Sequence, residues 1–97
     1  MNKKVSDKPL KEAIDRFLEL YGMDVKFQEI EVINTYNKLM GQMIVSKTEK
    51  IWFKNGTLNL RLNSSVLKQE LNYNKSKIAE LINEDLGKEL IQEVVIR

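Results

Sequence analysis

The stretch KIWFKNGTLNLRLNSSVLKQEL, Lys50–Leu71, decides the fold of this chain. Its Asn55-Gly56 pair stands between two runs rich in apolar residues, which is the strongest short-range signal for a β-hairpin with a two-residue turn. Ser64 and Ser65 follow the second run, and serine is a preferred residue at the start of a helix. The stretch therefore predicts a hairpin that leads directly into a helix.

The two-residue turn also predicts which side chains share a face of the hairpin. Successive side chains of a strand point to opposite faces, and one face here is entirely apolar, so it must be the buried one. That face holds Ile51, Phe53, Leu58, Leu60 and Leu62. The opposite face holds Lys50, Trp52, Lys54, Thr57, Asn59 and Arg61. A slip of one residue would bury the charges, so the register is well determined.

Two helices are predicted before the hairpin. Apolar residues recur at spacings of three and four after Pro9, which suits the first turn of a helix, and Gly22 supplies a left-handed stop. A second helix begins near Asp24 and is apolar on two sides, which indicates a helix sandwiched in the core. It ends or bends at Gly41, and residues 42–49 form either one more helical turn or a connection.

A third helix and a third strand are predicted after the hairpin. The helical period continues to Gly87, with an interruption at Asn74 that indicates a bend. The β-branched residues of LIQEVVIR then predict a strand with Val94 and Ile96 facing inward. The order α-α-β-β-α-β favours an α+β fold, a three-stranded sheet with helices packed on one face, and a third strand parallel to the second. The sequence leaves open which of the first two strands it pairs with.

Length and composition limit the domain organisation and the chemistry. We expect a mobile N-terminal arm over residues 1–8 and one domain over residues 9–97. Cysteine and histidine are absent, which removes thiolate and imidazole metal ligands and the commonest general base. The Ser-x-x-Lys spacing at Ser65 lacks its downstream partners and is interpreted as a helix cap. We expect no enzyme activity, cofactor, metal or membrane segment, and a cytoplasmic location.

Positive charge is concentrated on the hairpin and the helix that follows it. Residues 42–77 hold seven basic and two acidic side chains, whereas residues 1–41 are balanced and residues 78–97 are acidic. A concentrated field of this kind favours an anionic partner. The candidate nucleic-acid-binding residues are Lys50, Trp52, Lys54 and Arg61 on the outer hairpin face, with Lys47, Lys68 and Lys75 extending the basic surface.

Trp52 among these cations resembles a stacking platform for a base inside a phosphate-attracting field. Lys50 lies opposite Arg61, and this like-charge pair costs stability unless an anion lies between the two side chains. An alternative of equal weight is that strand 3 side chains, a loop or a second subunit covers Trp52, and that the lysines protect an edge strand.

The chain also resembles the DciA-like family of bacterial proteins, formerly a domain of unknown function, in its short Bacteroidetes-type form. The resemblance is carried by NTYNKLMG at 34–41, Thr48, IWFKNGTLNLRLNSSVLKQEL at 51–71, LINEDLG at 81–87 and VVIR at 94–97. It implies a KH-like domain and a non-enzymatic DNA-binding accessory protein related to loading of the replicative helicase.

The expected partners are therefore single-stranded or structured DNA and the replicative helicase, with the chain a monomer or a weak homodimer. The first alternative is a protein-interaction module that uses the Trp52 face for a homodimer or a helicase contact, without binding nucleic acid directly. The second alternative is an RNA-binding module.

Overall fold

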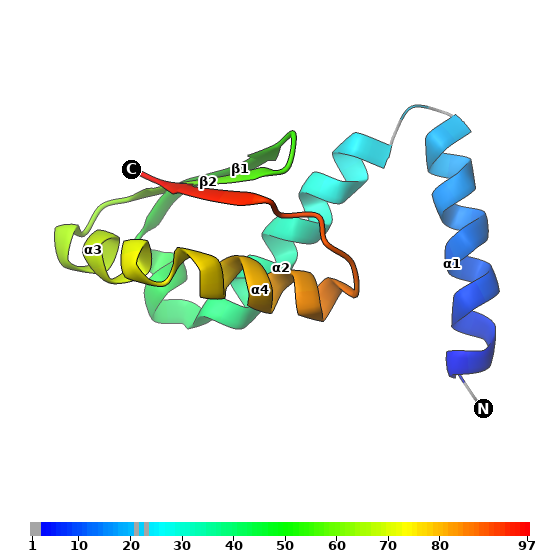
Figure 1. Ribbon diagram of the computed structural model, residues 1–97, viewed down its shortest axis with the longest axis horizontal. Coiled ribbons are helices and arrows are strands. Elements are labelled where there is room, and N and C mark those ends of the chain that lie inside the picture. Colours follow the sequence, from blue (N-terminus) through cyan, green and yellow to red (C-terminus); the bar gives the residue numbers. More distant parts are fainter. Residues whose placement is uncertain (1–2, 21, 23) are drawn as a thin grey trace.

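The computed structural model describes residues 3–20, 22 and 24–97, with side chains from residue 9 onward (Figure 1). It is an α+β fold, as predicted. The elements are α1 (Lys3–Leu20), α2 (Asp24–Ser46), β1 (Thr48–Lys54), β2 (Thr57–Leu62), α3 (Ser65–Tyr73), α4 (Lys75–Leu86) and β3 (Glu93–Ile96). The further label KH-like stays a prediction.

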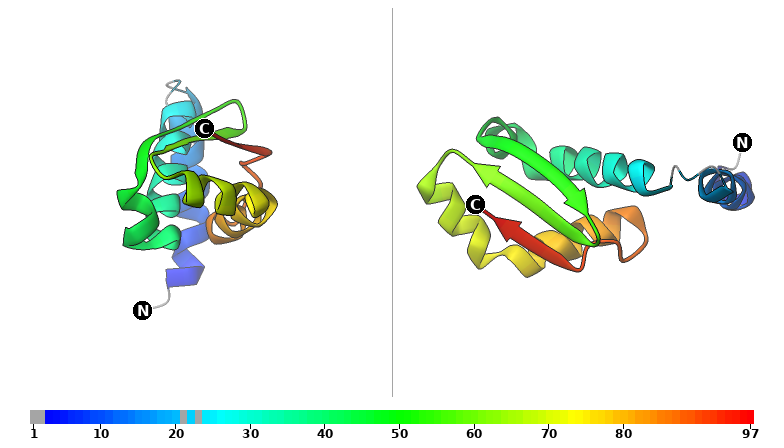
Figure 2. Two further views of the ribbon diagram at one scale, coloured as in Figure 1. Left: turned by 90° about the vertical axis from the view of Figure 1, so that its left-hand side faces the viewer. Right: turned by 90° about the horizontal axis from the view of Figure 1, so that it is seen from above.

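The three strands form one sheet in the order β1-β2-β3. β1 and β2 are antiparallel, and β2 and β3 are parallel, so the third strand pairs with the second. Helices α2, α3 and α4 lie on one face of the sheet, as predicted, and no described element covers the other face (Figure 2). The uncovered outer face of the sheet is therefore available for binding.

The hairpin has the predicted register. Asn55 and Gly56 both have positive φ values, 50° and 80°, as a type I′ turn requires. Phe53 pairs with Leu58 and Lys50 pairs with Arg61. The predicted apolar face points at the helices and forms the centre of the core.

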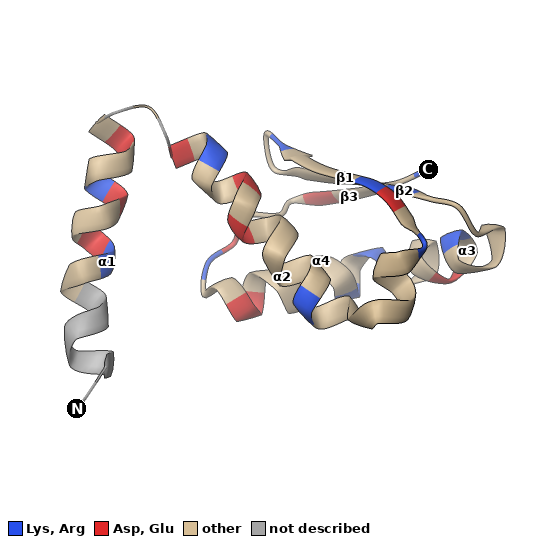
Figure 3. Ribbon diagram, turned by 180° about the vertical axis from the view of Figure 1, so that it is seen from behind, with Lys and Arg blue, Asp and Glu red and all other residues tan. Residues whose placement is uncertain are grey.

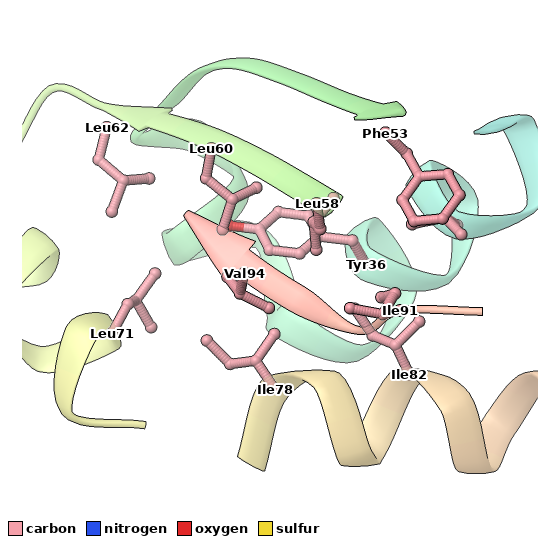
Figure 4. Close-up of a cluster of buried hydrophobic side chains, with 11 residues drawn as sticks. Tyr36, Phe53, Leu58, Leu60, Leu62, Leu71, Ile78, Ile82, Ile91 and Val94 are labelled. Atoms are coloured by element: carbon pink, nitrogen blue, oxygen red, sulfur yellow. The ribbon is translucent and has the colours of Figure 1, made fainter. Parts of the chain in front are cut away.

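The core lies between the sheet and helices α2, α3 and α4 (Figure 4). Its buried apolar residues are Val32, Tyr36, Phe53, Leu58, Leu60, Leu62, Leu71, Ile78, Ile82, Ile91 and Val94. The prediction that α2 is sandwiched is wrong for much of the helix, because Phe27, Ile30 and Leu39 are exposed. Only the side of α2 that carries Val32 and Tyr36 meets the sheet, since the sheet has one helical layer.

The single third helix of the prediction is two helices, α3 and α4, which meet at Asn74. The Asn74 side chain donates a hydrogen bond to the Glu70 carbonyl over 2.9 Å, and its backbone N–H donates to the Leu71 carbonyl over 3.0 Å. Asparagine competes in this way for backbone groups that would otherwise continue the helix. The predicted bend is therefore a complete break, while Gly87 ends α4 with φ 75° as expected.

The remaining helix boundaries differ in smaller ways. Gly41 kinks α2 with φ 85° and ψ 163°, and one more helical turn continues to Ser46, which settles the ambiguity at residues 42–49. α1 begins at Lys3, well before Pro9, so most of the predicted N-terminal arm has helical backbone. Mobility of residues 1–8 stays a prediction, and residues 1 and 2 lie outside the described part.

β3 is shorter than LIQEVVIR because Asn83 holds the residues before it in a loop. The Oδ1 atom of Asn83 accepts hydrogen bonds from the backbone N–H groups of Leu90, over 3.1 Å, and Ile91, over 2.9 Å. Its Nδ2 atom donates to the Ile91 carbonyl over 2.9 Å. One side chain therefore positions the chain where it enters β3.

Replacing Asn83 by alanine should lower the free energy of unfolding by about 2–3 kcal/mol, because partly buried backbone groups would lose their partners. Asn83→Asp keeps the acceptor for both N–H groups and should cost less. Urea unfolding of the three proteins measures the order. Equal losses in the two variants would show that the accepted bonds do not hold this loop.

The hydroxyl of Tyr36 forms a hydrogen bond with Thr48, the first residue of β1. Thr48 Oγ1 donates to the Ile44 carbonyl over 2.8 Å, so the Tyr36 hydroxyl, 3.0 Å from Thr48 Oγ1, is the donor of that bond. Burial raises the pKa of Tyr36 above its usual value. Ionised Tyr36 is therefore disfavoured in the folded protein.

Tyr36→Phe should cost about 1 kcal/mol at pH 7, where the lost hydrogen bond is the main effect. The raised pKa stabilises the wild type below the unfolded value of about 10, and this contribution is lost as pH rises toward the folded value. The stability gap between the two proteins should therefore narrow above about pH 10. Urea unfolding at neutral and alkaline pH tests this, and a constant gap would contradict it.

Candidate nucleic-acid interface

The outer face of the sheet presents its side chains in rows, because paired residues of neighbouring strands lie side by side. Arg97 continues the line of β3 beyond Ile96: its N–H donates to the Leu60 carbonyl over 2.8 Å, and its carbonyl accepts from the Leu62 N–H over 2.9 Å. These bonds place Arg97 beside Arg61. The rows are Lys50, Arg61 and Arg97; Trp52, Asn59 and Val95; and Lys54, Thr57 and Glu93.

The first row consists of three cations: Lys50, Arg61 and Arg97. All three are exposed, and none forms an ion pair with a carboxylate in the described part of the chain. Like charges that face each other across strands repel and lower stability. A row of this kind is relieved when an anion binds to it.

Trp52 lies in the next row and is half-buried. The Lys50 ammonium is 4.9 Å from the centroid of its ring, and the Arg97 guanidinium carbon is 5.9 Å away. Both distances fall within the range of cation–π attraction. Trp52 is therefore neither fully exposed nor covered by another element: Arg97, which follows β3, shields part of the ring, and two cations are held next to it.

Lys54 and Lys47 lie at the edges of this surface. Lys54 is exposed in the third row, on the far side of Trp52 from the three cations, and Glu93 lies in the same row. Lys47 is exposed in the turn between α2 and β1, and its carbonyl accepts a hydrogen bond from the Asn63 N–H over 2.9 Å. The described structure thus brings Lys50, Trp52, Lys54 and Arg61 onto one face, as predicted.

Lys68 and Lys75 belong to a second surface at the junction of α3 and α4. They line a hollow of about 490 Å³ together with Ser65, Gln69, Asn72 and Tyr73. α3 extends past the end of the sheet where β2 and β3 finish, so this hollow adjoins the cationic row but does not share its face (Figure 2). Tyr73 is 82% exposed, which is unusual for an aromatic side chain outside an interface.

Two residues of these surfaces are missing from the sequence-based prediction. Arg97 and Val95 share the outward side of the third strand, opposite Val94 and Ile96, so that side could be identified from the sequence. The neighbour of Arg97 could not be identified without knowing that β3 pairs with β2. Tyr73 lies next to the break at Asn74. The sequence predicts a continuous helix through Asn74, and such a helix gives no signal that the ring of Tyr73 is exposed at a junction between two helices.

Ion pairs between described side chains lie away from the cationic row. The four ion pairs are Lys26–Glu29, Lys38–Asp85, Lys77–Glu80 and Lys88–Glu31, at 3.8, 2.7, 3.3 and 3.3 Å. All four involve α2, α4 or the loop after α4, and acidic and basic segments alternate along α1 and α2 (Figure 3). Lys50, Arg61 and Arg97 differ from these four lysines because no ion pair is formed by any of the three within the described part of the chain.

The described residues contain no group of three or more acidic side chains that could hold a metal ion. No helix among residues 3–20 and 24–97 is long and apolar enough to cross a membrane.

Fold and site together define a small α+β domain with one helical layer and an open sheet face, on which three cations without an ion pair among the described residues lie beside a tryptophan. The chain belongs to the family described as "Dna[CI] antecedent, DciA", which its residues 9–96 match, so the resemblance seen in the sequence is confirmed at family level. This family is a helicase loader-type accessory family, associated with helicase loading in DNA replication. No curated protein and no solved structure matches the chain.

Proposed function

We propose that this protein is a non-enzymatic DNA-binding accessory factor of replicative helicase loading, and that single-stranded DNA binds across the outer face of its sheet. The observation that carries the proposal is the row of unpaired cations, Lys50, Arg61 and Arg97, beside the only tryptophan of the chain. Membership of a replication family supports DNA as the partner. In that role the protein acts in the bacterial cytoplasm.

The cationic row suits a phosphate backbone. Neighbouring strands are about 4.8 Å apart, so three cations in a row span roughly 10 Å, which more than one phosphate can reach. Arg61 and Arg97 supply guanidinium groups that bind phosphate oxygens in pairs, and Lys50 supplies a point charge. Lys54 and Lys47 extend the field along β1 and past its start.

Trp52 supplies the contact to a base. In the free protein, Lys50 and Arg97 lie against its ring. Phosphate is a stronger partner for both cations than an aromatic face, so binding draws them toward the backbone and frees the ring to stack on a base. Stacking needs an unpaired base, which favours single-stranded over duplex DNA, and it tolerates any base, so sequence selectivity is weak.

The hollow at the α3–α4 junction extends the proposed path of the single-stranded DNA. It adjoins the cationic row and offers Lys68, Lys75 and the exposed ring of Tyr73. A DNA strand that leaves the outer face of the sheet past Arg61 meets these side chains next. Tyr73→Ala should then reduce affinity for long oligonucleotides more than for short ones.

Trp52→Ala tests the proposed site. Stacking of a base on an aromatic ring contributes about 1–3 kcal/mol, so the variant should bind a fluorescently labelled single strand about tenfold or more weakly. Leu81→Ala, on α4 in the layer behind the sheet, is the control and should bind normally. No binding by the wild type at low salt, or an unaltered Trp52→Ala variant, would refute the nucleic-acid function.

RNA of the same sequence, measured in parallel, separates the RNA-binding alternative, since tighter binding of RNA would favour it. A pull-down with the purified replicative helicase tests the second part of the proposal. We expect the helicase to be retained by the wild type. Retention that is lost in Trp52→Ala, in a protein that binds no DNA, would instead support a protein-interaction module that uses the Trp52 face.

A further inference from the structure

The two ends of the outer sheet face differ in charge. The cationic row lies at one end, and the row at the other end holds one cation, Lys54, and one acid, Glu93, with Thr57 between them. The middle row is uncharged and consists of Trp52, Asn59 and Val95. A phosphate backbone is therefore attracted to one end of the face and meets no net charge at the other end.

The carboxylate of Glu93 is held at the neutral end of the face. Glu93 is the first residue of β3 and pairs with Thr57, and its backbone N–H donates to the Gly56 carbonyl over 3.2 Å. Its side chain is exposed and lies on the side of the strand opposite to the buried Val94. Glu93 borders a hollow of about 200 Å³ that Lys75 also lines. Among the described residues it forms no ion pair with this or any other cation.

The distance from the cationic row to Glu93 follows from the strand geometry. Arg97 and Glu93 are four residues apart along one strand line. Each residue of a strand advances by about 3.3 Å, so about 13 Å separates their backbone positions. Lys50 and Lys54 are four residues apart on β1 as well. The face therefore measures about 13 Å from its cationic end to its neutral end.

The width of the face bears on the choice between single-stranded and duplex DNA, which differ by a second phosphate backbone. The grooves of B-DNA are about 6 and 12 Å wide. A duplex that sets one backbone on the cationic row therefore brings its other backbone across the uncharged middle row and toward Glu93. A single strand has only uncharged bases to place there.

We propose that Glu93 is a specificity-determining residue that excludes a second phosphate backbone, so that the outer sheet face selects single-stranded over duplex DNA. This inference rests on the proposed function and adds a repulsive element to the attraction of the cationic row. A carboxylate that faces a phosphate is a like-charge contact, and binding sites use such contacts to reject the wrong partner. A single strand avoids this contact because its backbone lies on the cationic row.

Lys54 does not cancel the effect of Glu93. The two residues lie on β1 and β3, with β2 between them, and neighbouring strands are about 4.8 Å apart, so roughly 10 Å separates their backbone positions. A phosphate above β3 is therefore nearer to the carboxylate than to the ammonium group. Without the acid the row would carry a net positive charge, and a second backbone would be attracted to it.

Fluorescence anisotropy with one labelled oligonucleotide, alone and annealed into a blunt duplex, tests the role of Glu93. At low salt, Glu93→Lys should bind the duplex about tenfold more tightly and the single strand no more than about threefold more tightly, because only the duplex gains a phosphate contact at this position. Glu93→Gln removes the repulsion without adding a cation, so its ratio of duplex to single-strand affinity should lie between those of the wild type and Glu93→Lys. The salt slope of duplex binding should steepen by about 0.9 in Glu93→Lys, as expected for one added phosphate contact.

Glu84→Lys is the matched control, because it makes the same change in net charge on α4, in the helical layer behind the sheet. Glu84 is exposed and has no ion pair among the described residues, so this variant should fold and keep the wild-type ratio. Circular dichroism confirms that each variant is folded.

The outcomes separate this inference from the proposed function. Single-strand binding by the wild type, together with an unchanged ratio in Glu93→Lys or an equal change in Glu84→Lys, would overturn the role of Glu93 and leave the proposed function intact. A wild type that binds duplex as tightly as single-stranded DNA would also overturn that role. A wild type that binds neither form would overturn the proposed function and this inference together.

Discussion

Arg61→Glu combined with Arg97→Glu is expected to weaken binding of single-stranded DNA by about 100-fold or more at low salt. Each arginine that meets a phosphate contributes on the order of 1.5–3 kcal/mol, and its replacement by an acid adds repulsion. Both residues lie in the cationic row and lack carboxylate partners in the described structure. Both are exposed, so the fold should tolerate the changes. Fluorescence anisotropy with a labelled oligonucleotide measures the loss.

The matched control changes the net charge by the same amount elsewhere. Lys26→Glu combined with Lys77→Glu alters two lysines on α2 and α4 that form exposed i,i+3 pairs with Glu29 and Glu80. Such pairs contribute little to stability, so this protein should also fold. It should keep most of its affinity. Equal losses in the two double variants would show that DNA responds to net charge and that the sheet face is not the site.

Among the single substitutions proposed, Leu60→Ala should lower the free energy of unfolding most. Leu60 is 0% exposed. It lies at the centre of the sheet, and its side chain is part of the core between the sheet and helices α2, α3 and α4 (Figure 4). Truncation of a buried leucine costs about 2–5 kcal/mol, because the transfer free energy is lost and a cavity remains. The free energy of unfolding of a small domain is about 5–15 kcal/mol in total, so the Tm of the variant should be lower by about 10–25 °C.

Val66→Ala provides the comparison, since Val66 is exposed on α3 and the change should stay within about 0.5 kcal/mol. Thermal unfolding followed by circular dichroism measures both proteins. A Leu60→Ala protein that melts within a few degrees of the wild type would mean that the sheet and helices are not held together by this core.

The hairpin could be predicted in detail because local chemistry specifies it. Asn55-Gly56 specifies the turn, and the alternation of apolar and polar residues then specifies the register, so Lys50, Trp52, Lys54 and Arg61 could be placed on one face. The parallel direction of the third strand followed from the helical crossover, which returns the chain to the end of the sheet where the second strand begins. These features depend on short-range geometry that the sequence expresses directly.

The parts that escaped prediction depend on long-range packing. The periodicity of α1 and α2 predicts apolar stripes but not what covers them, so the exposure of Leu10, Ile14 and Phe27 could not be foreseen. Arg97 joins the cationic row only because β3 pairs with β2. That pairing depends on how the whole sheet packs. The break at Asn74 depends on two hydrogen bonds that compete closely with continuation of the helix.

The most direct test of the proposed site uses the fluorescence of Trp52, which reports on that site alone because the chain has one tryptophan. Single-stranded DNA should quench this fluorescence to saturation at low salt, as bases stack on the ring. The logarithm of the binding constant should fall with the logarithm of salt concentration with a slope of about −2, as expected for three phosphate contacts. Oligonucleotide binding seen by anisotropy without any change in Trp52 emission would contradict DNA binding on the outer sheet face.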